Sequence, residues 1–411
     1  MKYSKVNKFL CTANFVSIFV GFFLVTSALL PANALDDSLV RSVTLPYRAV
    51  MLFVAILIVL LNFKSVKSPY PLSFVAFLLF WILLIVRISY DSTRQDIDVG
   101  NTFMTWVYIF GICIPTVFSL MVSIKVIDFE KAFWWILIMT GVTFAFIILK
   151  NNALFGLDAG ISGRHQGNAA VSTISFGHFG ATALILSVYA LYYKNTTFLS
   201  KLALLAIILI GLFFVLRAGS RGPLLALVVV FIFLYFARFR RLFESLVAVS
   251  IALFILSLST NLIVEAIGTI SPLLEARLIA SFEESGFGSR DRYYAEAIDL
   301  FLKSPAWGSQ YLINFGDGSA PDYAHNILLD SLMATGILGT ILLLYFLSIG
   351  LMKSNYLLKK NHPEGWLALL LVQQIVFNMT SGAFYLNPTL SALLVVILLN
   401  YRNSRYLSQR Q

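Results

Sequence analysis

The chain consists largely of long apolar runs, and these runs restrict its fold more than any other feature. A helix that crosses the ~30 Å hydrocarbon core needs about 20 mostly apolar residues. Helices and closed barrels are the structures that satisfy every backbone polar group in lipid. The sequence therefore predicts an all-α polytopic membrane protein, forming one integral membrane domain over residues 1–411. About twelve spans are expected, at Phe9–Leu30, Tyr47–Phe63, Pro71–Ile88, Phe103–Val122, Ala132–Leu149, Ala170–Tyr193, Leu202–Leu216, Pro223–Phe236, Leu246–Val264, Ile327–Leu351, Trp366–Phe384 and Pro388–Tyr401.

Composition agrees with this class and gives no sign of a metal site. Hydrophobic residues make up 59% of the chain and charged residues 12%, whereas roughly a quarter of a soluble domain is charged. The two cysteines, Cys11 and Cys113, lie within apolar runs. We interpret them as packed side chains, because two isolated cysteines make neither a disulfide framework nor a metal pattern.

The distribution of lysine and arginine predicts the orientation. If the N-terminus is cytoplasmic, the inner connections hold 12 Lys and 6 Arg and the outer ones hold 2 Lys and 10 Arg. An excess of cations marks the cytoplasmic side, so both termini are expected there. The outer cations are mostly arginine, whose planar fork binds phosphate in a bidentate manner. We therefore expect the outer face to bind phosphate.

The segment "LRAGSRGPLL" lies between two apolar runs and carries Arg217 and Arg221. Residues 202–236 would form a helix of ~52 Å, too long for one span, so two helices joined by a tight turn are expected. Gly219 and Gly222 permit the turn, and Pro223 suits the first turn of the second helix.

Arg217 and Arg221 point to an anionic ligand at this hairpin. An arginine near hydrocarbon costs about 2.5–3.5 kcal/mol by insertion scales. Two arginines in one hairpin would be offset by an anionic partner, so the hairpin predicts a lipid-linked phosphate or diphosphate as ligand. The alternative is that both side chains extend to phospholipid headgroups.

One long outer segment, residues 265–326, contains an amphipathic pattern in "SRDRYYAEAIDLFLKSP". Ser289 is the expected N-cap and Pro305 the stop signal. Its apolar side chains are expected to lie against the membrane or the bundle: Tyr294, Ala297, Leu300 and Phe301. Its arginines, Arg290 and Arg292, are further candidate diphosphate ligands, as is Arg164 before the sixth span.

The segment "AHNILLDSLMATGILG" places His325 at the outer mouth of a span. Asn326 follows it, and Asp330 lies one turn deeper. A carboxylate within the membrane suggests a functional site, although a hydrogen bond to a neighbouring span would also explain it. His178, inside a span, is interpreted as a packed, hydrogen-bonded histidine. The polar residues of the eleventh span predict interhelical hydrogen bonds: Gln373, Gln374 and Asn378.

These segments resemble the O-antigen ligase and O-antigen polymerase family of bacterial inner-membrane proteins. The resemblance covers Arg217 to about Leu343 and is carried by "GSRGPLLAL", "SPAWGSQ" and "AHNILLDSLMATGILG". It implies the fold of a C-type membrane glycosyltransferase in the inner membrane. It also implies an undecaprenyl-diphosphate-linked oligosaccharide as donor and an acceptor hydroxyl on the periplasmic side. A chain-length regulator protein is a further expected partner, and nucleic acid is not expected.

The expected chemistry follows from the activated donor. A sugar diphosphate requires no cofactor or metal in principle, only neutralisation of the leaving diphosphate and a base for the acceptor hydroxyl. Arginines are the candidates for the first role. His325 is the candidate for the second, because imidazole can accept a proton near neutral pH.

These patterns are compatible with three functions. A polymerase uses a second lipid-linked repeat unit as acceptor, whereas a ligase uses lipid A–core. We favour the polymerase. One observation weakens this choice: the Arg-x10-Gly pattern typical of such polymerases occurs only once in the long loop, from Arg277 to Gly288. A transporter is less favoured, because the spans carry little charge and the chain has no obvious internal repeat.

Overall fold

The computed structural model describes residues 4–31, 37–65, 70–94, 98–100, 102–150, 168–238 and 290–408, with a few positions between 267 and 279. Within these residues the regular structure is helical, and the β-type pairing is an isolated bridge between Ile313 and Asp322. The prediction of an all-α membrane protein is confirmed, and the chain is a multi-pass membrane protein.

Eight stretches are long and apolar enough to span a membrane. Two of them are interrupted by a π-helical segment, at Ser17–Gly21 and Ile109–Cys113. The spans comprise α1 (Lys5–Val16) with α2 (Phe22–Leu29), α3 (Asp37–Asn62), α4 (Leu72–Thr93), α5 (Thr102–Tyr108) with α6 (Ile114–Ser123), α7 (Phe129–Lys150), α8 (Thr173–Tyr193), α9 (Phe198–Arg217) and α15 (Ile327–Lys359).

Three shorter apolar helices complete the described bundle: α10 (Arg221–Arg238), α16 (Gly365–Thr380) and α17 (Pro388–Ser408). Eleven of the twelve expected spans therefore correspond to helices. The expected span Leu246–Val264 lies outside the described residues. One further helix, α14 (Arg290–Lys303), belongs to the long outer segment.

Two helix ends differ most from the sequence expectation. α3 begins at Asp37, ten residues before the expected Tyr47, and continues through Pro46. α15 continues to Lys359 instead of ending at Leu351. The length of an apolar run does not reveal either extension, because both contain polar residues. A helix can continue past the hydrocarbon boundary, since its backbone hydrogen bonds are satisfied internally.

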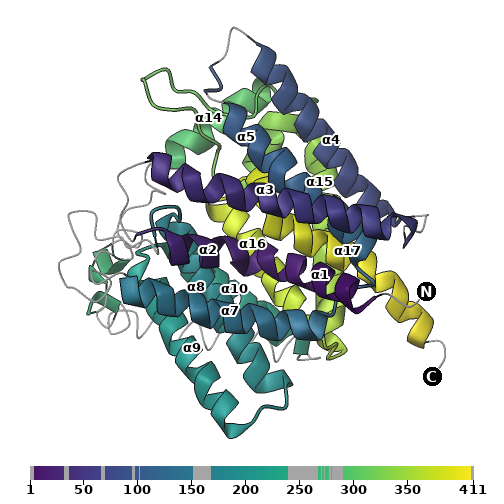
Figure 1. Ribbon diagram of the computed structural model, residues 1–411. Coiled ribbons are helices and arrows are strands. Elements are labelled where there is room, and N and C mark those ends of the chain that lie inside the picture. The colour runs from purple at the N-terminus through teal and green to yellow at the C-terminus, as the bar shows by residue number, and fades with distance from the viewer. Residues whose placement is uncertain are drawn as a thin grey trace.

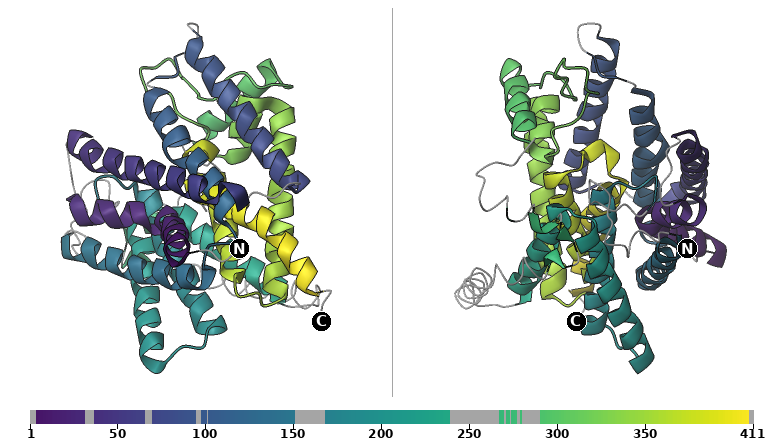
Figure 2. Two further views of the ribbon diagram at one scale, coloured as in Figure 1. Left: turned by 45° about the vertical axis from the view of Figure 1, so that its right-hand side comes forward. Right: turned by 90° about the vertical axis from the view of Figure 1, so that its left-hand side faces the viewer.

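α16 and α17 form the centre of the bundle (Figures 1 and 2). α16 packs against α8, α10, α15 and α17, and its residues from Trp366 to Val372 are all buried. The views show α4, α14 and the start of α15 on one side of this pair and α7 to α10 on the other. The start of α10, the start of α15 and the end of α16 are thereby brought together, and the motifs "GSRGPLLAL" and "AHNILLDSLMATGILG" lie at this point.

Candidate functional site

The arginine hairpin consists of two helices, as the sequence predicted. α9 ends at Arg217, α10 begins at Arg221, and Gly219 adopts a φ of 57° in the turn between them. Only glycine takes this left-handed conformation without strain. The two arginines differ in their surroundings: Arg217 is 5% exposed, whereas Arg221 is exposed.

The hairpin lies against the outer end of α16. A Cβ atom on Gly222 would be 3.1 Å from Thr380 Oγ1 and 3.4 Å from His178 Nε2. The His178 ring packs on Phe377, with ring centroids 4.5 Å apart. His178 is packed as predicted, but the predicted hydrogen bonding of its ring is wrong, because neither ring nitrogen is hydrogen-bonded to a described residue. A buried imidazole therefore adjoins the hairpin, and no local sequence pattern indicates this proximity.

α14 is the amphipathic helix expected in the long outer segment. It ends at Lys303, before Pro305, and it packs on α15 through Ala297 and Leu300. The expected N-cap, Ser289, lies outside the described residues. Arg290, the first residue of α14, is partly buried.

Arg292 is engaged within the loop. Its Nη1 atom lies 2.8 Å from Asp317 Oδ2, and its guanidinium stacks 3.8 Å above the Phe315 ring. Hydrogen bonds from Ser319, with a further one from Arg292, lower the pKa of Asp317 to about 2, so this carboxylate is ionised at neutral pH. The predicted diphosphate role of Arg292 therefore has to compete with an existing ion pair.

His325 occupies a strained position at the start of α15. Its φ is 58°, uncommon for a residue with a side chain and found mostly where function or surrounding structure imposes it. Its Nε2 atom lies 3.3 Å from Asp322 Oδ2, while its buried Nδ1 atom has no described hydrogen-bond partner. Tyr323 and Tyr293 contact the ring edge to face, at centroid distances of 4.4 and 5.3 Å. One ring nitrogen thus has a carboxylate neighbour, and the other is unsatisfied.

Asn326 and Asp330 hold the backbone on either side of His325. Asn326 is the N-cap of α15, and its side chain accepts hydrogen bonds from the backbone of Leu328 and Leu329 at 3.0 and 3.3 Å. Asp330 Oδ1 accepts a hydrogen bond from the Ala324 backbone at 2.7 Å. Both side chains therefore fix the turn that carries the histidine.

α15 is broken at Gly336, where φ is 62° and ψ is −161°. The break frees backbone groups, and the loop after α14 satisfies them. Ser309 N donates to Met333 O at 2.8 Å, and Ile337 N donates to Pro305 O at 2.8 Å. The segment "SPAWGSQ" thus supplies hydrogen bonds that the break within "ATGILG" has removed from the helix.

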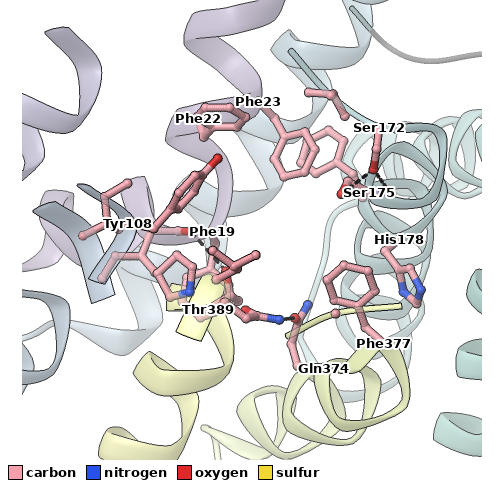
Figure 3. A pocket seen from close by; sticks show the side chains of 18 of the residues that line it. Phe19, Phe22, Phe23, Tyr108, Ser172, Ser175, His178, Gln374, Phe377 and Thr389 are labelled. Atoms are coloured by element: carbon pink, nitrogen blue, oxygen red, sulfur yellow. Dashed lines mark hydrogen bonds between the residues drawn. The ribbon is translucent and has the colours of Figure 1, made fainter. Parts of the chain in front are cut away.

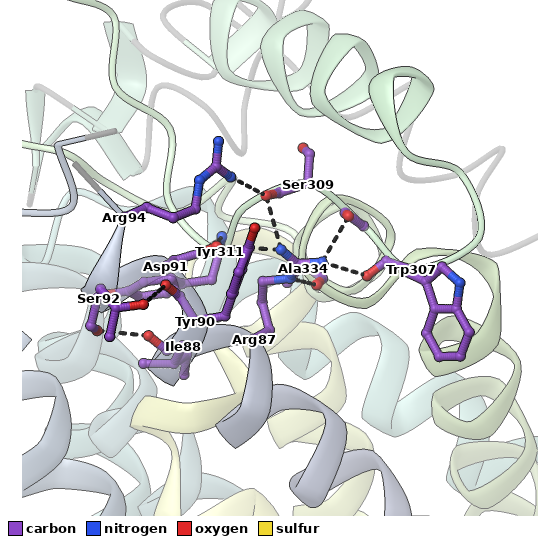
Figure 4. A network of polar contacts seen from close by, with 12 residues as sticks. Arg87, Ile88, Tyr90, Asp91, Ser92, Arg94, Trp307, Ser309, Tyr311 and Ala334 are labelled. Atoms are coloured by element: carbon purple, nitrogen blue, oxygen red, sulfur yellow. Dashed lines mark hydrogen bonds and ion pairs between the residues drawn. The ribbon is translucent and has the colours of Figure 1, made fainter. Parts of the chain in front are cut away.

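Arg87 of α4 completes this crossing (Figure 4). Its Nε atom donates to Ala334 O at 2.9 Å. Its Nη atoms donate to the carbonyls of Trp307, Gly308 and Ser309 at 2.8–3.0 Å.

The nearby Asp91 is fully buried. Its two carboxylate oxygens accept from Arg87 at 3.3 Å and from the Tyr311 backbone at 2.8 Å. This network was not anticipated, although Arg87 and Asp91 stand four residues apart near a span end. The expectation that outer arginines serve phosphate is wrong for Arg87, whose donors are used by the protein's own carbonyls.

The hairpin and the histidine turn meet at the C-terminal end of α16. Tyr323 Oη donates to Ser381 O at 2.9 Å, and the neighbouring Thr380 faces Gly222. Burial raises the pKa of Tyr323, so its hydroxyl remains a donor. The hairpin and the histidine turn, about a hundred residues apart in sequence, are thus joined through the adjacent residues Thr380 and Ser381 at the end of α16.

Several expected site residues cannot be placed. Arg164, Arg277 and Gly288 lie outside the described residues. Of the interhelical hydrogen bonds expected for the eleventh span, those of Gln373 and Gln374 are present, whereas the expectation is wrong for Asn378, which donates to Gln374 O within its own helix at 2.7 Å. Gln373 Nε2 donates to His178 O at 2.8 Å, and Asn387 Nδ2 donates to Gln374 Oε1 at 2.9 Å.

Comparison with known proteins identifies the same part of the chain. A family model described as O-antigen ligase matches residues 204–344. This range includes the arginine hairpin, α14 and the broken start of α15. No curated protein matches the chain, and no solved structure does. The resemblance read from residues 217–343 is therefore confirmed, because residues 204–344 of this multi-pass membrane protein match the O-antigen ligase family model.

Proposed function

We propose that the protein is an O-antigen polymerase of the bacterial inner membrane. It would transfer glycan from undecaprenyl diphosphate to a hydroxyl of another lipid-linked repeat unit at the periplasmic face. The family match supports a glycosyltransferase that acts on lipid-linked glycans. The observation that carries the proposal is the convergence of the His325 turn and the arginine hairpin on Thr380 and Ser381.

His325 is proposed as the general base. Asp322 beside Nε2 favours the tautomer with the proton on that nitrogen, which leaves the Nδ1 lone pair to accept a proton. The same carboxylate would stabilise the imidazolium ion that forms, as in other histidine–carboxylate pairs. The unsatisfied Nδ1 atom also needs a partner, and an acceptor hydroxyl would provide one.

The reaction would be a direct displacement. The acceptor oxygen forms a bond to the anomeric carbon, and the bond between that carbon and the diphosphate oxygen breaks. The hydroxyl proton passes to His325, and the bonding electron pair leaves with the diphosphate. Arg217 and Arg221 would neutralise this leaving group, with Arg290 and Arg164 as further candidates. The step needs no metal or cofactor in this proposal.

The cellular arrangement follows from the cation distribution. The lysine-rich connections would face the cytoplasm together with both termini, and the arginine hairpin and α14 would face the periplasm. The start of α1 and the end of α17 lie toward the same end of the bundle, which supports a common side for the termini (Figure 1).

The ligase remains the second candidate, because the matching family model is described as O-antigen ligase. In that case the acceptor would be lipid A–core. A deletion strain distinguishes the functions through its surface polysaccharide. A lost polymerase leaves single repeat units on the core, and this is the expected result. Carrier-linked polymer with bare core would instead show a ligase. Repeat units retained at the cytoplasmic face would show a transporter.

A further inference from the structure

A cavity of about 390 Å³ lies between α2, α3, α8 and α16 (Figure 3), and Tyr323 of the proposed catalytic turn forms part of its wall. We call it the Arg48 cavity. Phenylalanine rings make up much of its wall, and polar side chains lie among them: Tyr108, Ser172, Ser175, Gln374 and Asn387. Cavities of this size and mixed lining are typical of small-molecule sites.

Arg48 is the charged side chain in this wall. It lies in the first half of α3 and is 6% exposed. Nη2 donates to Tyr108 Oη at 2.6 Å, and the guanidinium lies 4.1 Å from the centre of the same ring. Its buried Nε atom has no described partner. The Nη2 atom of the guanidinium is thus held by Tyr108, while the Nε–H group has no hydrogen-bond acceptor among the described residues.

No carboxylate lines the Arg48 cavity or pairs with Arg48 among the residues that the structure describes. A buried charge without a counterion is costly, and within a membrane span it usually marks a functional site. An anion in the cavity would remove this cost. A guanidinium with free donors is best matched by a phosphate, which accepts from two of them at once.

The remaining polar wall suits the same ligand. Ser172 caps α8, and the hydroxyls of Ser172 and Ser175 both line the cavity at the N-terminal end of that helix. Helix N-termini favour anions. The apolar wall, which includes Phe22, Phe23 and Phe179, would contact hydrocarbon next to the phosphate. The combination fits the junction between a lipid tail and its phosphate.

The Arg48 cavity is separated from the catalytic turn by one side chain. Tyr323 lines the cavity and also contacts the His325 ring. A molecule with its phosphate at Arg48 could therefore extend a glycan toward His325. A polymerase needs a second phosphate site of this kind, because its acceptor carries a diphosphate at one end of the repeat unit and the attacking hydroxyl elsewhere.

We propose that the Arg48 cavity binds the diphosphate of the acceptor, a second undecaprenyl-diphosphate-linked glycan, while the arginine hairpin binds the donor. The assignment rests on the proposed polymerase function and deepens it. It also separates polymerase from ligase, because lipid A–core has no undecaprenyl diphosphate.

The test counts bound carrier lipids. The full-length protein is reconstituted in phosphatidylcholine nanodiscs with excess undecaprenyl diphosphate, and native mass spectrometry gives the number of carriers bound per chain. We expect two for the wild type, one for Arg48→Gln and one for Arg217→Gln. Arg41→Gln is the matched control, because it removes an exposed arginine from the same helix, and it should still bind two.

The outcomes separate the alternatives. Two carriers bound to a folded Arg48→Gln variant, or a single carrier bound to the wild type, would overturn the proposal. Displacement of the Arg48-dependent carrier by excess phosphatidylglycerol would show an ordinary headgroup site and would overturn it too. If Arg48→Gln does not fold, the double variant Ser172→Ala/Ser175→Ala should weaken the second carrier at least about tenfold, and unchanged binding would refute the assignment. The polymerase function itself is tested separately, by measuring glycan transfer in the His325 variant. The number of bound carriers does not depend on turnover, so the two proposals can fail independently.

Discussion

Gly308 and Gly336 face each other where the outer loop crosses the break in α15. Both have positive φ, at 76° and 62°. A Cβ on Gly308 would lie 2.4 Å from the Ala334 carbonyl carbon, and one on Gly336 would lie 2.5 Å from the Ala306 carbonyl carbon. A side chain on either glycine would therefore clash with the backbone next to the other glycine. The crossing fixes α14 and its loop to α15, the helix that carries His325.

The first prediction concerns this crossing. Gly308→Ala adds both a strained φ and a clash with backbone, so we expect it to destabilise the protein by more than about 1–3 kcal/mol. Gly316→Ala is the matched control, because Gly316 also has positive φ, at 68°, but open space around it. Thermal unfolding in detergent should place Gly308→Ala well below Gly316→Ala. Equal midpoints would mean that the close approach does not matter.

The second prediction concerns Arg87. Arg87→Lys keeps the charge but cannot reach the four carbonyls that the guanidinium fork satisfies. A buried acceptor left unsatisfied costs about 1–3 kcal/mol. We expect a lower unfolding temperature and faster hydrogen exchange in residues 305–311. Arg41→Lys, at an exposed position of α3, should change neither. A wild-type exchange pattern in Arg87→Lys would show that the hydrogen bonds of Arg87 do not hold this loop in place.

The third prediction concerns the proposed base. His325→Gln should lower turnover at least ~10²-fold, equivalent to about 3 kcal/mol, while donor binding is largely retained. His362→Gln serves as the control, because His362 lies in the connection between α15 and α16 at the opposite end of α15. Transfer of radiolabelled glycan and donor affinity are both measured in liposomes. Loss of donor affinity together with turnover would place His325 in the diphosphate site, and near-normal turnover would leave it a structural role.

The fourth prediction separates the arginines. Arg217→Lys and Arg221→Lys should each weaken donor binding about tenfold or more, because a hydrogen bond to a charged group contributes about 1.5–3 kcal/mol and lysine loses the bidentate geometry. Arg292→Lys should have a smaller effect, because Arg292 is paired with Asp317. Titration with undecaprenyl diphosphate at constant ionic strength gives the three affinities. The reverse order would show that the loop arginine, and not the hairpin, holds the diphosphate.

The fifth prediction concerns orientation. Ser319 and Asn195 are both exposed, in the outer loop and in the α8–α9 connection. A cysteine at Ser319 should react with a membrane-impermeant thiol reagent in spheroplasts, and a cysteine at Asn195 should react only after lysis. The native Cys11 and Cys113 are buried and should give little background. Labelling of the Asn195 position alone would invert the topology.

The sequence by itself determined the class, most of the helices and the resemblance to the O-antigen ligase family. Apolar runs of fixed length predict spans because lipid leaves the backbone no other partner. The turn at Gly219 and the end of α14 before Pro305 are likewise local consequences of glycine and proline chemistry. These properties depend on neighbouring residues, so pattern alone reveals them.

Only the tertiary structure decided which arginines are used by the protein itself. Arg87 and Arg48 look alike in sequence, each a single cation in a span. Packing places the first among four backbone carbonyls and the second in the wall of a cavity with an unpartnered Nε atom. The meeting of Tyr323 with Ser381, and hence of the histidine turn with the hairpin, likewise depends on α16 lying between them. Such contacts join residues far apart in the chain, and no local periodicity encodes them.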